Sequence, residues 1–192
     1  MFKISNAGSL FRIGVFLVLG VQVALGQDQQ PSASLPEPEH AFLKKFVGRW
    51  ETRWETTAEF PANSGQPSIV WKSVMEAKML GELWMIAEMD GDMMGTRMNA
   101  IITLGFDGKK KKYLGTWVDS IMNHMWHYEG TVEGNTITLN AKGPNFNSPG
   151  KETDFQDVYT FTTDDQMEIR SRMKGEDGKW VTFMTAESVR KK

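Results

Sequence analysis

Hydrophobic and polar residues alternate along most of the chain after Arg49. In the first such row, Trp50, Thr52, Trp54 and Thr56 lie on one side and mostly charged residues lie on the other. Because successive side chains of a strand point to opposite faces, this alternation predicts a half-buried β-strand. The pattern recurs down the chain, and the ten predicted strands cover about residues 50–58, 69–79, 83–89, 98–106, 113–119, 123–132, 136–141, 155–161, 167–173 and 180–189.

The links between these rows are short. Asp107-Gly108, Glu133-Gly134-Asn135 and Asp177-Gly178 are typical of hairpin turns, and residues 143–150 predict a longer loop at one rim. No link has room for the crossover helix that parallel strands require. Ten twisted antiparallel strands either close into a barrel or split into a sandwich, and successive hairpins favour the barrel. We therefore predict an all-β fold, an antiparallel up-and-down barrel of about ten strands.

A helical pattern precedes the first strand. Pro38 suits the first turn of a helix, and apolar residues follow it at helical spacing, namely Phe42, Leu43, Phe46 and Val47. Gly48 is typical of a residue that ends a helix. The pattern predicts a short amphipathic helix at about residues 38–46.

The N-terminal residues have the features of a cleavable signal peptide. Lys3 and Arg12 lead into a short apolar run, and Ala24-Leu25-Gly26 has the small residues that a signal peptidase recognises. The run is shorter than the roughly 20 apolar residues that cross a bilayer, so we expect cleavage before Gln27 and no stable membrane insertion afterwards. Residues 1–26 are therefore the predicted signal peptide of an exported protein, periplasmic or secreted.

The remaining chain divides into a linker and one domain. Residues 27–37 are polar and rich in proline, which predicts a flexible linker. Residues 38–192 form the single predicted barrel domain. After cleavage the chain is long enough to bury about two thirds of its unfolded surface, so one core can stabilise it.

Composition excludes several kinds of chemistry. The chain has no cysteine, which rules out disulfides, thiol nucleophiles and thiolate metal sites. Two of the 22 basic residues belong to the leader, which leaves 20 against 24 acidic residues and a net charge of −4 after cleavage. This charge argues against nucleic acid or an anionic membrane as a partner.

Two sets of residues resemble known families. Gly48-Arg49-Trp50, after a short helix, resembles the Gly-x-Trp signature of lipocalins and other calycins, in which the tryptophan closes one end of the barrel. A wider pattern over residues 38–190 resembles the bacterial family known as domain of unknown function number 1579. Its segments are Glu39-His40, Leu43, Val47-Gly48 with Trp50, Thr103-Leu104-Gly105-Phe106-Asp107, Gly115-Thr116-Trp117-Val118-Asp119-Ser120, Trp126, Tyr128-Glu129-Gly130 and Gly178-Lys179-Trp180. The resemblance implies a lipocalin-like bacterial domain, and it implies no activity and no catalytic residues.

The seven tryptophans can serve two purposes. Large side chains at inward positions usually fill a barrel, and they can also line a pocket for an apolar or ring-bearing ligand. The candidate ligand-binding residues with aromatic rings are Trp50, Trp54, Trp117, Trp126 and Tyr128.

Two carboxylates fall on predicted inward faces. Asp157 lies in a row with Phe155 and Tyr159, and Asp119 follows Trp117 on the same face. A buried carboxylate is costly unless it is paired, so we expect Asp157 to pair with an arginine, to lie near an open rim, or to orient a ligand. Both aspartates are candidate ligand-binding residues. If they share one cavity, they could instead act as the general acid and base of an enzyme.

His124 and His127 are weak candidates for metal or haem ligands. Their odd offset in a strand would place them on opposite faces, so they cannot bind one ion together without a bulge. A single histidine could still be the axial ligand of a haem, as in some calycin-like barrels. The sequence otherwise indicates no cofactor.

The first functional hypothesis is a non-enzymatic barrel that binds a small apolar or aromatic ligand. The second is a filled scaffold or protein-interaction module without a ligand. The third is a haem- or metal-binding barrel, or an enzyme that uses inward carboxylates. An empty interior of a few hundred Å³ would favour the first hypothesis, and a filled interior would exclude it. The sequence indicates no oligomeric state.

Overall fold

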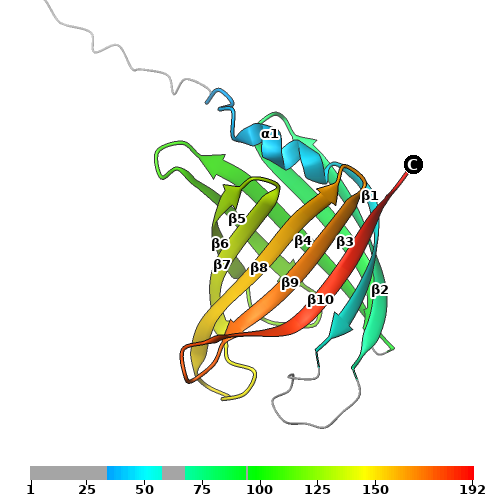
Figure 1. Cartoon of the computed structure of the whole chain (residues 1–192), viewed down its shortest axis with the longest axis vertical. Coiled ribbons are helices and arrows are strands. Elements are labelled where there is room, and N and C mark those ends of the chain that lie inside the picture. The colour runs from blue at the N-terminus through cyan, green and yellow to red at the C-terminus, as the bar shows by residue number, and fades with distance from the viewer. Residues whose placement is uncertain (1–33, 58–67, 94) are drawn as a thin grey trace, which may run out of the picture. The chain divides into compact units, whose positions relative to one another are not determined.

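Ten antiparallel strands form one closed barrel (Figure 1). The computed structural model describes residues 34–57, 68–93 and 95–192. The predicted signal peptide and most of the predicted linker lie outside these residues. The strands are β1 (Gly48–Thr56), β2 (Val70–Leu80), β3 (Trp84–Met93), β4 (Thr96–Asp107), β5 (Lys112–Asp119), β6 (Trp126–Glu133), β7 (Thr136–Pro144), β8 (Glu152–Thr163), β9 (Gln166–Lys174) and β10 (Trp180–Lys191).

Consecutive strands pair with each other, and β1 pairs with β10 to close the ring. In this register Trp54 lies opposite Ala186 of β10 on one side and Trp71 of β2 on the other. Every strand thus has two hydrogen-bonded neighbours, which excludes the alternative of an open sandwich. The predicted all-β fold, an antiparallel up-and-down barrel of about ten strands, is confirmed.

Alternation along each strand separates the core from the surface. On β4, Met98, Ala100, Ile102 and Leu104 are buried, whereas Ile101 is 45% exposed on the outside. The buried side chains of all ten strands converge on the lumen. Removing their apolar area from water stabilises the barrel by roughly 25 cal/mol per Å².

A short helical segment covers one end of the barrel (Figure 1). It consists of α1 (His40–Leu43) and a 3-10 turn, η1 (Lys44–Phe46), so the helix predicted at 38–46 is present in a shorter form. Phe46 is buried with its ring 4.9 Å from that of Phe161. The Trp50 Nε1–H donates a 2.7 Å hydrogen bond to the Phe46 carbonyl. Trp50 therefore lies at a barrel end, as the lipocalin resemblance implied.

Arg190 of β10 holds this segment against the barrel. Its guanidinium lies 4.2 Å from the centre of the Trp50 ring and donates to the carbonyls of Lys45, at 2.9 Å, and Val47. It also forms a 3.1 Å ion pair with Asp165. One side chain near the C-terminus thus satisfies carbonyls at the end of the helical segment, which would otherwise lack partners.

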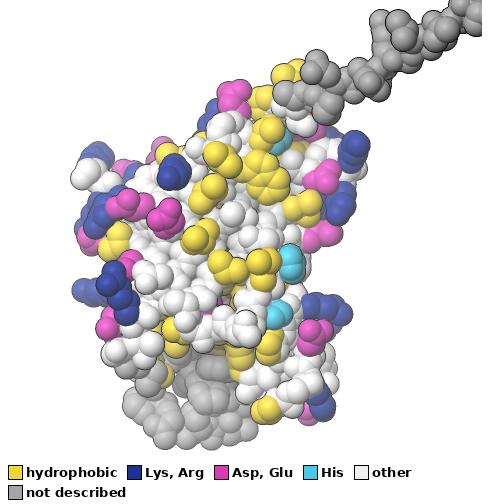
Figure 2. Space-filling view, turned by 180° about the vertical axis from the view of Figure 1, so that it is seen from behind, with side chains coloured by type: hydrophobic (Ala, Val, Ile, Leu, Met, Phe, Trp, Pro, Cys, Tyr) yellow, Lys and Arg dark blue, Asp and Glu magenta, His cyan; other side chains and the backbone are white. Residues whose placement is uncertain are grey.

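The outer face of β3 and β4 carries a half-exposed tryptophan. Trp84 lies opposite Gly105, and a Cβ atom on that glycine would come within 2.5 Å of the indole. The glycine therefore gives the ring room to lie over the strand. Figure 2 shows further apolar side chains among charged ones on the face turned away in Figure 1. Within the described residues, no helix has the length and hydrophobicity to cross a membrane.

Candidate functional site

A cavity of about 370 Å³ opens at the end of the barrel opposite the helical segment. Its wall comes from the ends of strands around the ring, from Thr56 of β1 to Met184 of β10. The wall is mostly apolar. Its aromatic side chains are Trp54, Trp71, Trp117, Trp126, Tyr128, Phe146, Phe155, Tyr159 and Phe183.

The cavity brings together six of the seven candidate ligand-binding residues. These six are Trp54, Trp117, Asp119, Trp126, Tyr128 and Asp157. Trp50 is the exception, because it is completely buried beneath the helical segment at the other end. Its indole fills the barrel there and has no part in the cavity wall.

Trp54 and Trp71 form a stacked pair in the wall. Their ring centres are 6.0 Å apart and their planes differ by 9°. The Trp54 Nε1–H donates a 2.8 Å hydrogen bond to Ser73 Oγ. The Trp71 Nε1–H is buried and has no hydrogen-bond partner in the described part of the chain. The pair thus presents fixed aromatic surface to the cavity.

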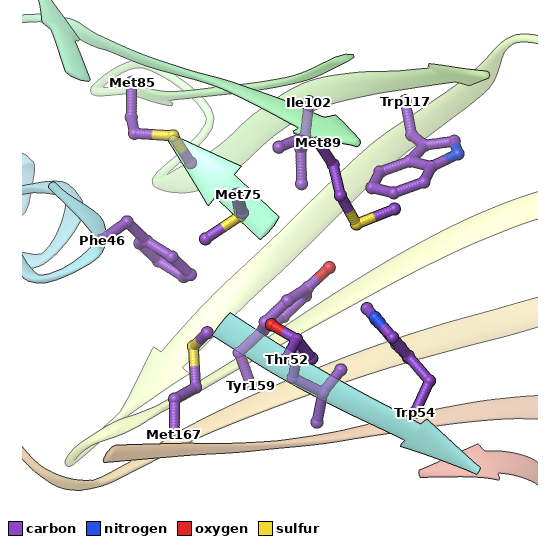
Figure 3. Close-up of a pocket in the computed structure, with 11 residues that line it drawn as sticks. Phe46, Thr52, Trp54, Met75, Met85, Met89, Ile102, Trp117, Tyr159 and Met167 are labelled. Carbon is purple, nitrogen blue, oxygen red and sulfur yellow. The ribbon is translucent and has the colours of Figure 1, made fainter. Parts of the chain in front are cut away.

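The lumen becomes narrow toward the helical segment (Figure 3). A gap of about 20 Å³, enough for about one water molecule, lies between Phe46 and the larger cavity. Trp54 and Trp117 lie on opposite walls of this gap in Figure 3, and they line the larger cavity as well. Methionine side chains occupy much of the remaining space, namely Met75, Met85, Met89 and Met167. One half of the barrel is therefore filled and the other half is hollow.

Asp157 lies in the hollow half and is held by two hydroxyl groups. Tyr128 Oη donates to Oδ2 and Ser171 Oγ donates to Oδ1, each at 2.5 Å. Burial raises the pKa of Asp157, and the two hydrogen bonds offset part of that rise. No arginine pairs with Asp157 among the described residues. Of the three expected settings for this carboxyl, the arginine pair is therefore not found in the described part of the chain, and a position near an open rim or one that orients a ligand remains.

The charge of Asp157 also affects the neighbouring phenols. Burial, followed by the nearby Asp157 carboxylate, raises the pKa of both Tyr128 and Tyr159 well above the ordinary value. Both phenols therefore stay protonated over the physiological range, and the Tyr128 hydroxyl remains a donor to Asp157.

Asp119 ends β5 and lies in the same cavity as Asp157. Its Oδ1 accepts hydrogen bonds from the backbone N–H groups of Ile121, at 2.9 Å, and Met122, at 2.8 Å. Its Oδ2 accepts one from Trp117 Nε1 at 3.0 Å. Three N–H donors therefore surround the carboxylate, which fixes the turn after β5 and orients the Trp117 indole.

The three histidines lie away from the cavity wall. His40 is buried in α1, and His127 is exposed on the outer face of β6. The strand predicted from residue 123 begins only at Trp126, so His124 precedes it and packs edge-on against the Trp126 ring at 4.8 Å. A haem in this cavity would find no histidine ligand in its described wall. Within the described residues, no three His, Asp or Glu side chains gather as metal ligands.

Sequence reasoning missed several residues of the wall. Ser171 and Tyr159 lie on predicted inward faces, and only the folded barrel shows that both line the cavity that holds Asp157. Gly143 is not part of the wall, but it was missed as well: a Cβ atom there would come within 2.2 Å of the Trp126 ring, which belongs to the wall. A glycine inside a strand signals such a close approach, although the pattern does not say to which side chain.

Comparisons with known proteins bear on the fold. The crystal structure of Rv2717c from M. tuberculosis has a TM-score of 0.56 and 12% identity, over 81% of this chain and 99% of that one. The S-type phycobiliprotein lyase CPES from Guillardia theta has a TM-score of 0.53 and 15% identity, over 80% and 93%. These likenesses concern the fold alone. Among curated proteins, none matches the sequence.

The family comparison covers nearly the whole described domain. A family model with the description "Protein of unknown function (DUF1579)" matches residues 35–190. This range includes the helical segment, all but the last residue of the barrel strands, and every residue of the cavity wall. The chain therefore belongs to the DUF1579 family, as its sequence resemblance indicated.

Proposed function

We propose that this protein is a non-enzymatic binding protein that holds a small apolar or ring-bearing molecule in the open half of its barrel. The observation that supports this most is the aromatic-walled cavity of about 370 Å³. Its volume falls within the range of small-molecule sites, which are concave, mostly apolar and provided with a few polar groups. Asp157, with its two hydroxyl partners, is such a polar group.

The cavity argues against the two alternatives. In a filled scaffold, side chains would fill the whole lumen as they do near Phe46, whereas the other half of this barrel holds the cavity. An enzyme with two working carboxylates needs both to exchange protons. Three N–H groups already donate to Asp119, so this residue is better suited to fixing the turn than to acid–base chemistry.

A fluorescent probe tests this proposal. N-phenylnaphthylamine is neutral, and its emission rises in apolar surroundings, so the purified protein should enhance its emission saturably. Met98→Trp enlarges a side chain of the cavity wall and should weaken binding at least about fivefold by occupying the space. Ile101→Trp is the matched control, because it adds the same indole to the outer face of the same strand.

The control should bind the probe within about twofold of the unchanged protein, since the cavity is intact. Circular dichroism of both variants shows whether the barrel has formed. Equal binding by both variants, or no saturable enhancement by the unchanged protein, contradicts the proposal.

Export is part of the same proposal. The predicted leader supports it, because its basic residues, apolar run and Ala24-Leu25-Gly26 match the requirements of signal peptidase. N-terminal sequencing of the protein from its own cells should find Gln27 as the first residue. A mature chain that retains the leader would contradict export with cleavage. Native mass spectrometry of the same material should detect a co-purified small molecule.

A further inference from the structure

The cavity has acidic side chains and no basic ones in its described wall. Asp119 and Asp157 line it, without any Lys, Arg or His. A carboxylate in apolar surroundings is costly without a compensating charge. Asp157 therefore lacks the positive partner that such a group normally has.

The remaining lone pairs of Asp157 can accept further hydrogen bonds. Each carboxylate oxygen has two lone-pair sites, and the hydroxyls of Tyr128 and Ser171 use one on each oxygen. Asp157 keeps some accessible surface although protein surrounds it, because it faces the cavity. A ligand with two or more N–H donors could therefore bind both oxygens at once.

A second polar group points to a ligand independently. Tyr159 follows Asp157 by two residues on β8, so both side chains point inward. Tyr159 is only 6% exposed, yet its hydroxyl has no hydrogen-bond partner within the described residues. Figure 3 shows this hydroxyl directed into the lumen. The hydroxyl oxygen keeps some accessible surface toward the cavity, so it is free to form a hydrogen bond with a polar group of a bound molecule.

Aromatic faces around the carboxylate favour the same kind of ligand. Trp117, Trp126 and Tyr128 line the cavity together with the stacked pair of Trp54 and Trp71. The faces of indole and phenol rings attract organic cations, most strongly when water is excluded. The wall thus combines apolar contact area with surfaces that tolerate positive charge.

We propose that the ligand is an apolar organic amine bound as its ammonium cation, with Asp157 as its counter-ion and the aromatic rings around its body. This deepens the function proposed above and depends on it. The ammonium N–H groups donate to Asp157, and the Tyr159 hydroxyl accepts or donates one further hydrogen bond. A ligand carboxylate would instead be repelled by Asp119 and Asp157, so the cavity selects against apolar acids.

A matched series of ligands tests the charge preference. Naphthylmethylamine, naphthalenemethanol and naphthoate share one ring system and differ in charge. Calorimetry with the purified protein at neutral pH should give an amine affinity at least about tenfold above that of the alcohol, with naphthoate weakest. Asp157→Asn should lower the affinity for the amine to that for the alcohol. The affinity of this variant for the alcohol should stay within about threefold of that of the unchanged protein.

Asp154→Asn is the matched control. Asp154 is on the same strand, three residues earlier, and it forms ion pairs with Lys142 and Lys174 away from the cavity. The same chemical change there should leave the preference for the amine intact.

The outcomes separate this inference from the function that it depends on. Equal affinities for amine and alcohol in the unchanged protein would overturn the amine inference while the binding function stands. The same holds if Asp157→Asn keeps the amine preference. Binding of none of the three naphthyl compounds would count against the binding function itself. If circular dichroism shows that Asp157→Asn is unfolded, the ligand series on the unchanged protein decides.

Discussion

Tyr128 Oη lies 2.5 Å from Asp157 Oδ2 and joins β6 to β8, two strands that β7 separates in the sheet. The bond therefore crosses the inner face of β7 instead of following the ladder. Ser171 of β9 holds the other oxygen of the same carboxyl. Three strands are thus connected through one side chain in the wall of the cavity.

Tyr128→Phe should lower the free energy of unfolding by about 2 kcal/mol, because it removes one of two donors to a buried carboxyl. Tyr159→Phe is the control, since the Tyr159 side chain is buried to the same extent and its hydroxyl has no hydrogen-bond partner in the described residues. Urea unfolding of the ligand-free protein should show a clearly smaller loss of unfolding free energy for Tyr159→Phe than for Tyr128→Phe. Equal losses would show that the bond to Asp157 adds no stability.

The stability of the protein should depend on pH through Asp157. Burial raises its pKa above the ordinary 3.8, so the native state binds more protons than the unfolded chain. The contribution of Asp157 to the free energy of unfolding therefore falls as pH rises from about 3.8 through the raised pKa. Tyr128, Tyr159, Ser171 and Asp119 are the polar groups that face it.

The contribution of Asp157 can be isolated by measuring the free energy of unfolding of the unchanged protein and of Asp157→Asn at several pH values. The stability of the Asn variant, relative to the unchanged protein, should increase between about pH 3 and pH 7. The difference between the two proteins removes the contributions of Asp90, Asp107 and Asp177. Neighbouring hydrogen bonds lower the pKa values of these three carboxyls, so their contributions to stability change with pH in the opposite direction. A pH-independent difference would mean that Asp157 has an ordinary pKa.

Arg190→Met should destabilise the barrel by about 2 kcal/mol, because the carbonyls of Lys45 and Val47 lose their donor. Arg49→Met is the comparison, since Arg49 forms an exposed ion pair with Glu76 and its loss should cost under about 1 kcal/mol. Thermal unfolding of the two variants measures both losses of stability.

Because Arg190 lies at the end away from the cavity, neither variant should change the affinity for N-phenylnaphthylamine. A large change would place the binding site elsewhere.

Gly143→Ala should weaken ligand binding by at least about threefold, because the added methyl group pushes the Trp126 ring toward the cavity. Gly105→Ala makes the same change beneath Trp84 on the outer surface. It should leave N-phenylnaphthylamine affinity unchanged, since Trp84 can turn into solvent. Fluorescence titration compares the two variants, and equal effects would show that the position of Trp126 does not matter for binding.

The fold follows from local patterns that are visible in the sequence. The alternation of apolar and polar residues indicates which side of a strand is buried, whichever strands lie beside it. An example is the buried row of Met98, Ala100, Ile102 and Leu104. Hairpin turns such as Glu133-Gly134-Asn135 then order the strands, because short links allow only adjacent antiparallel pairing. Closure needs one pairing between the ends of the chain, and ten twisted strands leave few alternatives.

The site is less predictable because it depends on distances around the ring. The inward direction of Asp157 is a local property, and the sequence indicates it. Its hydroxyl partners come from β6 and β9, so the Tyr128 and Ser171 contacts depend on stagger between strands. The same limit applies to Trp50 and Trp54, which share one inward row, although Trp50 lies beneath the helical segment and Trp54 lines the cavity. Periodicity gives the face of a strand and not the depth within the barrel.

The helical segment over Trp50 also determines how a ligand could exchange. With that end occupied by Phe46 and its neighbours, the cavity opens, in the part of the chain that the structure describes, at the other end of the barrel, where Asp119 fixes the turn after β5. The rates of binding and release can then be altered without altering the affinity. Substitutions beside Asp157 change how strongly a ligand is held, whereas substitutions at the rim change how fast it arrives and departs.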